Sequence, residues 1–159
     1  MNNVSIEELI KAGAHFGHPT SRWHPGFSNY ISMKKNGVHI IDMEQTSQCM
    51  IRAVEAIVKI VQGNGNILFV GTKKQAKDVV QQAADRCGMY YIVERWLGGT
   101  LTNYGTIKRS IKRLTLLEKE SSEIYANLTK KELNGLERER LRLADLHRGI
   151  KDMKHLPSA

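Results

Sequence analysis

Apolar residues follow two kinds of pattern along these 159 residues. Residues 67–70 (Ile-Leu-Phe-Val) and 89–93 (Met-Tyr-Tyr-Ile-Val) are short continuous apolar runs, which predict buried strands. Over residues 44–62 and 73–86, apolar side chains recur every three or four positions, which predicts helices with one buried face. Strands that alternate with helices in this way predict an α/β fold with a parallel sheet and right-handed crossovers.

The N-terminal region is predicted to contain smaller elements. Residues 5–8 (Ser-Ile-Glu-Glu) form a capping-box pattern, so a short helix is expected to begin there and to end near Ala14. Residues 15–25 are polar and aromatic and predict a loop. Two short apolar runs, residues 30–33 and 38–41, flank an Asn-Gly pair, which predicts a β-hairpin.

The C-terminal third is predicted to form two long, charged helices over residues 104–120 and 130–148. A Thr-Lys-Lys-Glu capping box opens the second helix. Helices joined by a short polar loop form an antiparallel hairpin in the simplest arrangement. The i,i+3 ion pairs predicted on the solvent face of the second helix are Glu137–Arg140 and Glu139–Arg142.

These elements predict one sheet domain with an inserted hairpin. We assign residues 1–102 and 149–159 to the sheet domain and residues 103–148 to the helical hairpin. The last ten residues have the character of a loop that returns the chain to a new strand. We therefore expect the second half of the sheet to lie outside these residues, so that the sheet described here is incomplete.

Composition narrows the class of partner. The net charge of +8 and the pI near 9.6 favour a polyanionic partner over an acidic small substrate. No apolar run approaches the ~20 residues that span a bilayer, and the polar residues after Met1 show no signal peptide. Cys49 and Cys87 are far apart, which favours two buried free thiols over a disulfide. We expect a cytoplasmic protein.

Two segments are candidate anion sites. Gly71 follows the first predicted strand, and Thr72 with Gln75 forms a capping-box pattern that predicts a helix start. The unpaired amides of a first helical turn attract anions, and Lys73 and Lys74 stand beside them. The second segment, residues 95–103, places an arginine and a tryptophan before two glycines.

Nucleotide binding, metal binding and catalysis have weaker support in the sequence. The loop after Gly71 is too short for a Walker phosphate loop, and the dinucleotide-binding pattern of three spaced glycines is absent. His15, His18 and His24 could approach a metal, but no CxxC or HExxH accompanies them. No nucleophile–base set or carboxylate pair stands out. Trp23 is interpreted equally well as a stacking platform for bases or as a core residue.

Trp96 is interpreted as a core residue in preference to a stacking platform.

The first helix of the predicted hairpin separates apolar from basic residues. At 100° per residue, Tyr104, Ile107, Ile111 and Leu114 fall within about 80° of one another. A separate arc of about 140° carries the basic residues. Those residues are Lys108, Arg109, Lys112 and Arg113. The pattern ends after Thr115, where Leu116 falls on the basic side and Glu118 on the apolar side. A polyanion would turn the repulsion within this basic stripe into attraction, so the stripe is expected to lie along a polyanionic partner.

Four motifs occur in a characteristic order and spacing: His-Phe-Gly-His at 15–18, Ile-Leu-Phe-Val-Gly-Thr-Lys-Lys-Gln at 67–75, Arg-Trp-Leu-Gly-Gly-Thr-Leu-Thr-Asn at 95–103 and Gly-Ile-Lys-Asp-Met at 149–153. Together they resemble the S-two family of bacterial small-subunit ribosomal proteins over the whole chain. The resemblance implies a flavodoxin-like parallel sheet with a protruding helical hairpin and no enzymatic activity or cofactor. It also implies binding to small-subunit (16S-type) ribosomal RNA near the head–body junction, and contact with other ribosomal proteins, including the first small-subunit protein, which recruits messenger RNA.

We therefore predict a structural, RNA-binding constituent of the small ribosomal subunit that supports translation, with a nucleotide-binding enzyme domain of doubly wound fold as the alternative. No catalytic or metal-binding residue, membrane contact or small-molecule substrate is predicted. The predicted RNA-binding residues are His15, His18, Arg22, Trp23, Lys73, Lys74, Arg95, Lys108, Arg109, Lys112 and Arg113.

Overall fold

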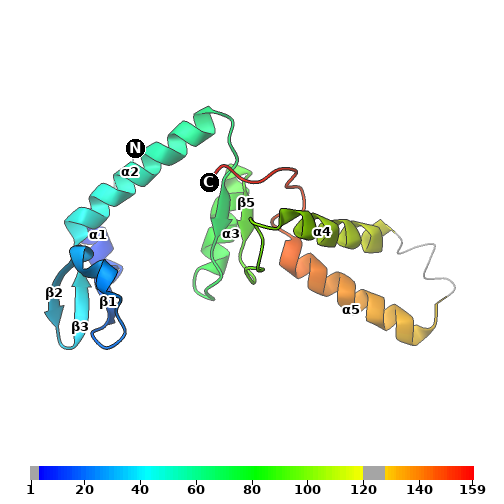
Figure 1. The fold of residues 1–159 in the computed structure, drawn as a ribbon, viewed down its shortest axis with the longest axis horizontal. Coiled ribbons are helices and arrows are strands. Elements are labelled where there is room, and N and C mark those ends of the chain that lie inside the picture. Colours follow the sequence, from blue (N-terminus) through cyan, green and yellow to red (C-terminus); the bar gives the residue numbers. More distant parts are fainter. Residues whose placement is uncertain (1–3, 120–127) are drawn as a thin grey trace. The chain divides into compact units, whose positions relative to one another are not determined.

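The computed structural model describes residues 4–119 and 128–159. The chain divides into two compact units, Met1–Gln62 and Gly63–Ala159, and each is described by itself (Figure 1). In the described part of the chain, no helix is long and apolar enough to cross a membrane.

The first unit combines a small antiparallel sheet with two helices. Its elements are α1 (Ile6–Lys11), β1 (Phe16–Pro19), the 3-10 helix η1 (Pro25–Tyr30), β2 (Ile31–Lys35), β3 (Val38–Ile41) and α2 (Met43–Gln62). The strand order is β1-β3-β2, with both pairs antiparallel. The predicted hairpin is confirmed, and positive φ angles of 50° at Asn36 and 75° at Gly37 form its tight turn.

The prediction for the N-terminal helix is correct at its start and wrong at its end. Ser5 and Glu8 form the predicted capping box, with reciprocal bonds of 3.1 and 3.0 Å. The helix ends at Lys11, before the expected Ala14, and Gly13 follows with a φ of +74°.

The loop predicted over residues 15–25 was also wrong in part. Its first residues form β1, which pairs with β3, and its end enters η1. Pairing with a strand formed later in the chain gives this segment its structure, so its own apolar pattern could not indicate a strand.

The second unit contains the predicted parallel strands. β4 (Leu68–Val70) and β5 (Tyr90–Ile92) pair in parallel, with Leu68 opposite Tyr90 and Val70 opposite Ile92, and α3 (Lys77–Cys87) connects them. The described fold is therefore a mixture of helices and small sheets with one parallel pair.

The predicted start of the connecting helix was wrong. A turn occupies the segment after β4, where the amides of Ala76 and Lys77 donate to the Lys73 carbonyl at 2.8 and 3.1 Å. The helix then begins at Lys77, with Ala76 as an N-cap that makes no side-chain bond. The capping box expected from Thr72 and Gln75 is not formed. The turn brings Gly71 close to α3, where a Cβ at this position would lie only 2.5 Å from Cγ2 of Val80.

The C-terminal segment borders the parallel pair on both sides. The Tyr91 amide in β5 donates to the Gly149 carbonyl at 3.1 Å. The Ser158 amide donates to the Asn66 carbonyl at 2.7 Å, and the Leu68 amide donates to the Ala159 carbonyl at 2.8 Å. The C-terminal segment, which was predicted to return the chain to a strand, therefore forms backbone hydrogen bonds beside β4.

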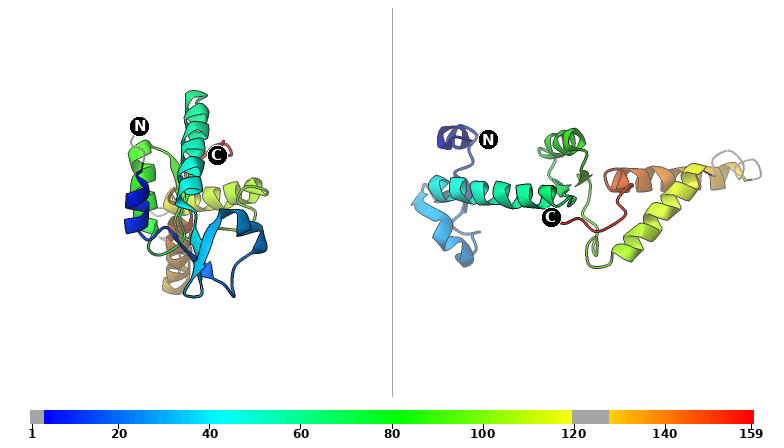
Figure 2. Two further views of the ribbon diagram at one scale, coloured as in Figure 1. Left: turned by 90° about the vertical axis from the view of Figure 1, so that its left-hand side faces the viewer. Right: turned by 90° about the horizontal axis from the view of Figure 1, so that it is seen from above.

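Two long helices complete the second unit: α4 (Tyr104–Lys119) and α5 (Lys130–His147). Figures 1 and 2 show α4 leading away from the sheet and α5 returning to it, which confirms the antiparallel hairpin. The capping box at the start of α5 is formed by Thr129 and Glu132. Residue 120 of the predicted first helix and the loop expected after it lie outside the described residues over 120–127.

The core of this unit joins the base of the hairpin to the sheet and the C-terminal segment. It consists of Ile92, Ile107, Ile111, Ile150 and Met153, each at most 8% exposed. The Tyr104 hydroxyl donates to the Met153 carbonyl. Burial raises the pKa of Tyr104, so this hydroxyl stays protonated as a donor.

Two predictions about burial were wrong. Cys49 and Cys87 are free thiols, but Cys49 is half-buried on α2 and Cys87 is exposed at the end of α3. Trp96, expected in the core, is 39% exposed. It follows β5 in a loop, where nearby packing is provided by Leu97 instead, which contacts the core cluster.

Candidate nucleic-acid interface

The basic stripe of α4 lies on the surface as the sequence predicts. The apolar seam is buried, with Ile107, Ile111 and Leu114 at 5%, 8% and 1% exposure. The exposed residues of the stripe are Lys108, Arg109, Lys112 and Arg113. Its predicted end is confirmed too: Leu116 is 49% exposed, while Glu118 turns toward the body and pairs with Lys151 at 2.6 Å.

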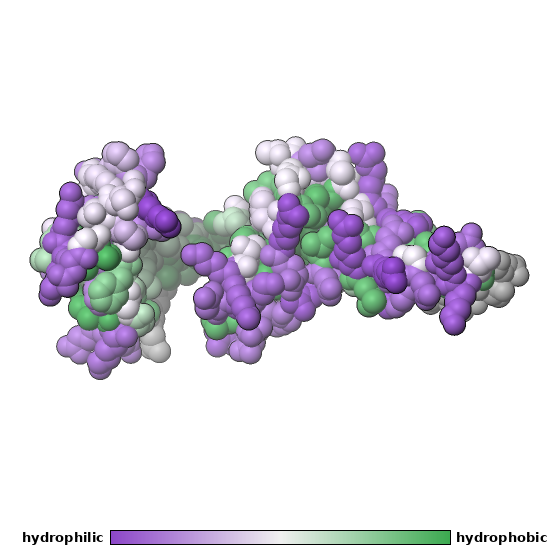
Figure 3. Space-filling model, turned by 90° about the horizontal axis from the view of Figure 1, so that it is seen from below, coloured by the Kyte–Doolittle hydropathy of each residue, from purple (hydrophilic) through white to green (hydrophobic). Residues whose placement is uncertain are grey.

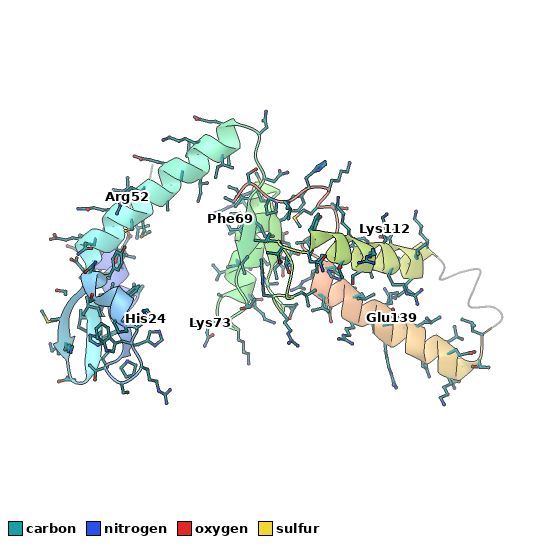
Figure 4. The ribbon with its side chains drawn as sticks, in the orientation of Figure 1. His24, Arg52, Phe69, Lys73, Lys112 and Glu139 are labelled. Carbon is teal, nitrogen blue, oxygen red and sulfur yellow. The ribbon has the colours of Figure 1, made fainter. Side chains whose placement is uncertain are left out.

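Three of the four stripe residues also make contacts within the hairpin. Lys108 Nζ lies 5.2 Å from the centre of the Tyr104 ring, and Arg109 Nη2 donates to Thr106 Oγ1 at 3.0 Å. Arg113 donates to both carboxylate oxygens of Glu139 in α5, at 3.2 and 3.0 Å. Lys112, labelled with Glu139 in Figure 4, has no such contact in the part of the chain that the structure describes.

The partner of Glu139 corrects one sequence prediction. Glu137 and Arg140 form the expected i,i+3 pair at 2.6 Å. Glu139 pairs across the hairpin with Arg113 and not with Arg142. A side-chain hydrogen bond from Arg113 and its charge lower the pKa of Glu139, so this carboxylate stays ionised. Arg142 is left with its charge exposed.

The first predicted anion site has a different backbone from the one expected. Lys73 and Lys74 are exposed, and Lys73 lies in the turn that leads into α3 (Figure 4). Because α3 begins only at Lys77, these lysines do not flank the amides of its first turn. Gly71 is explained by its close approach to Val80, so it does not indicate a phosphate loop. What remains at this place is a pair of exposed positive charges.

The second predicted segment forms a tight, tethered loop. Gly99 has a φ of +79°, and Thr100, only 1% exposed, donates from its hydroxyl to the Leu97 carbonyl at 2.6 Å. The Asn103 amide donates to the Gly99 carbonyl at 2.7 Å. Arg95 and Trp96 stand exposed at the start of this loop, so it presents a cation and an indole to solvent.

The N-terminal candidates lie in β1 and in the segments just before and after it. His18 and Arg22 are exposed, and Trp23 is half-buried against the His39 ring, with centroids 4.8 Å apart. Lys34 Nζ lies 5.8 Å from the Trp23 ring. The register of the sheet explains why Lys34 lies near Trp23: Lys34 pairs with His39 across β2 and β3, and Trp23 packs on His39. Trp23 is therefore neither fully buried nor fully exposed, and its role as a stacking platform for bases stays a prediction.

His39 is the residue in this region that sequence reasoning missed. It is 2% exposed, and neither of its ring nitrogens has a hydrogen-bond partner within the described residues. His15 Nδ1 is likewise buried without a partner among those residues. His24 has a local role, since its Nδ1 accepts the Gly26 amide at 3.1 Å and caps η1. In the described ranges, no three His, Cys, Asp or Glu side chains are placed to hold a metal.

The eleven predicted residues thus fall into two sets. His15, His18, Arg22 and Trp23 belong to the first unit, and the other seven belong to the second. On the face seen in Figure 3, hydrophilic residues cover most of the described part of the helical hairpin. The described features define a basic, mixed α/β protein that carries a positively charged helical hairpin.

Comparison with known proteins identifies the family. The chain matches ribosomal protein S2 over residues 9–159 and belongs to that family. It is similar to the small ribosomal subunit protein uS2 of Bdellovibrio bacteriovorus, with 47% identity over 161 aligned residues. The alignment covers the whole of this chain and 51% of that relative, so the chain spans about half the length of the curated relative.

Proposed function

We propose that this chain is a structural, non-catalytic constituent of the small ribosomal subunit that binds small-subunit ribosomal RNA. The observation that carries the proposal is the exposed basic stripe on α4, in a chain of the ribosomal protein S2 family. The name of the Bdellovibrio relative, a small ribosomal subunit protein, supports the same assignment. The cytoplasm is the corresponding compartment.

The stripe is unfavourable without a polyanion. Lys108 with Lys112, and Arg109 with Arg113, are like charges at i,i+4, which cost a few tenths of a kcal/mol per pair in an isolated helix. A negatively charged backbone turns this repulsion into attraction, and counterion release favours binding further. Since the opposite face of α4 is buried in the core, the helix holds these charges in a fixed orientation.

The finer fold proposal is a flavodoxin-like parallel sheet with the hairpin, residues 103–148, inserted into the sheet domain of residues 1–102 and 149–159. Backbone hydrogen bonds from residues 158 and 159 to residues 66 and 68 support it. Such bonds are the start expected of a further strand beside β4.

The remaining predicted residues are proposed as secondary RNA contacts. His15, His18, Arg22 and Trp23 belong to the first unit, and Lys73, Lys74 and Arg95 contribute charge in the second unit. Contact with other small-subunit proteins, including the first one, which recruits messenger RNA, is the further partner proposal.

The test measures the affinity for small-subunit ribosomal RNA as a function of salt. Replacing Lys108, Arg109, Lys112 and Arg113 by glutamine should lower the magnitude of the salt slope by roughly three to four, at about 0.9 per phosphate contact by analogy with B-DNA. Because Arg113 is already paired with Glu139, we expect a decrease nearer to the lower end of this range.

The control removes the same charge elsewhere, in a variant with Lys59, Arg86, Lys130 and Lys131 changed to glutamine. Its slope should change by less than that of the stripe variant. Equal slopes for the wild type and a folded stripe variant would move α4 out of the RNA interface. Binding of a mononucleotide without co-sedimentation with small subunits would favour the alternative enzyme function.

A further inference from the structure

A groove outside the predicted site lies beside α5. It has a volume of about 690 Å³. Its residues come from the start of α3, from the segment after β5 and from one face of α5. At 100° per residue, Arg142 lies about 40° from Arg138 around the axis of α5. His147, which bonds to Ser110 of α4, lies about 180° from Arg138. The groove therefore lies on another side of α5 than His147, although Arg138 and Arg142 also line a neighbouring pocket that includes Ser110 of α4.

Three arginines that pair with no other described residue line this groove. Arg95, Arg138 and Arg142 belong to its wall, and within residues 4–119 and 128–159 no hydrogen bond or ion pair joins their side chains to another residue. Arg95 was a sequence candidate, but Arg138 and Arg142 were missed. Their i,i+4 spacing was the available signal, although the predicted pairing of Arg142 with Glu139 obscured it.

The acidic residues of the groove do not cancel this charge. Glu94 is held by Lys77 Nζ at 2.5 Å and by Arg148 Nη2 at 3.2 Å, and the hydrogen bond from Lys77 lowers its pKa. Asp145 is the other carboxylate at the groove. Among the described residues that line the groove, the balance is therefore positive, with three exposed guanidinium groups and one carboxylate, Asp145, that is not already paired.

The rest of the groove is aliphatic. Leu97, Leu141 and Leu146 line it, and Leu141 is 51% exposed. A guanidinium binds phosphate oxygens through two parallel N–H bonds, and its plane also stacks on bases. An aliphatic surface between such groups accepts a ribose or a base. A duplex backbone would use the charges and leave this apolar surface empty.

We infer that this groove binds an unpaired nucleotide segment of RNA, with its phosphates on Arg95, Arg138 and Arg142 and its sugar or base against the leucines. This inference rests on the proposed RNA-binding function and adds a second, single-strand contact to the α4 stripe. An acidic protein segment is the less favoured occupant. A hollow of this volume suits a ligand of drug size, whereas stable protein partners bury about 800 Å² per side.

The experiment compares three variants of the full chain on small-subunit ribosomal RNA and on a short single-stranded RNA. The first carries Arg95→Gln, Arg138→Gln and Arg142→Gln. The second replaces the same arginines by lysine, and the control carries Lys59→Gln, Arg86→Gln and Lys131→Gln. Circular dichroism monitors the helix content of each variant.

The glutamine variant should bind the single-stranded RNA about 10-fold to 100-fold more weakly than the wild type. Its salt slope should fall in magnitude by about two, at roughly 0.7 per phosphate of a single strand. The lysine variant keeps the charge and loses the two-bond geometry, so its slope should stay while its affinity falls by a smaller factor. The control should lose less affinity than the glutamine variant.

Two outcomes would overturn the inference separately from the proposed function. One is wild-type affinity of the glutamine variant for single-stranded RNA, with the α4 stripe variant still impaired on ribosomal RNA. The other is retained RNA affinity together with a lost contact to another small-subunit protein, which would assign the groove to an acidic segment. Failure of the wild type to bind ribosomal RNA would overturn both proposals.

Discussion

The two helices of the hairpin have similar lengths and similar charged sequences, yet they are held in different ways. α4 buries Ile107, Ile111, Leu114 and Leu117, whereas α5 buries only His147 among its described residues. The basic residues of α4 form one continuous stripe. Those of α5 alternate with acidic residues, and two of its glutamates bind arginines.

This difference shows which helix positions the other. Four buried aliphatic side chains supply most of the stabilisation of α4, because burying one of this size contributes about 1.5–3 kcal/mol. α5 has half-buried leucines but no buried one among its described residues, and it joins α4 through the Arg113–Glu139 ion pair and the 2.7 Å bond between Ser110 Oγ and His147 Nε2. We therefore interpret α4 as the fixed element of the hairpin and α5 as the one that depends on it.

The largest expected effect comes from removing an apolar anchor of α4. Leu114→Ala should lower the free energy of unfolding by about 2–5 kcal/mol, because Leu114 is 1% exposed and a cavity would remain. Leu141→Ala on α5 should cost less than about 0.5 kcal/mol, because Leu141 is 51% exposed. Urea unfolding of both variants measures the contrast. Similar losses would show that the helices are equally anchored.

An intermediate effect is expected from pH, through His147. Burial lowers the pKa of His147 below its ordinary value of 6.5, since its 0% exposed ring is disfavoured when charged. The neutral ring's contribution to stability is complete above pH 6.5 and is lost as the pH falls through that value toward the folded-state pKa.

The measurement is the unfolding free energy of the wild type and of His147→Gln between neutral and acidic pH. The other histidines are the same in both proteins, so the difference between the two curves reports on His147. The wild-type curve should fall more steeply toward acid. Parallel curves would show that His147 does not couple the hairpin to pH.

The smallest effect is expected from the ion pair between the helices. Arg113 and Glu139 have side chains 44% and 42% exposed, so their pair should contribute about 0.2–1 kcal/mol, and less at high salt. A double-mutant cycle with Arg113→Gln and Glu139→Gln measures it. The Glu137–Arg140 pair within α5 is the matched control, with an expected contribution of about 0.3–0.5 kcal/mol. A coupling energy above about 1 kcal/mol for Arg113 and Glu139 would make their ion pair a principal determinant of hairpin geometry.

The order of elements and the α4 surface could be predicted from the sequence alone. The β-hairpin, the parallel strands, both long helices and the burial of Ile107, Ile111 and Leu114 follow from local patterns, because apolar spacing and turn chemistry act within a few residues. The division of α4 into a buried seam and a basic stripe belongs to this class, down to the outward turn of Leu116.

Tertiary contacts decided the features for which local patterns were misleading or silent. Thr72 and Gln75 form a capping pattern, but the packing of Gly71 on Val80 accompanies a turn, and the helix starts later. Residues 16–19 became a strand because β3 supplied a partner. In both cases the contact is made with residues outside the short segment on which the prediction rested.

The same limit applies to charge. The sequence by itself identified the basic residues, but the partner of each depended on which helix faces it. Glu139 pairs with Arg113 across the hairpin, because two donors of that arginine reach the two carboxylate oxygens. Arg142 lines the groove with Arg138 and Arg95 instead. Charge composition is a property of the sequence, whereas charge pairing requires distances of a few ångströms, and only the packed hairpin sets those distances.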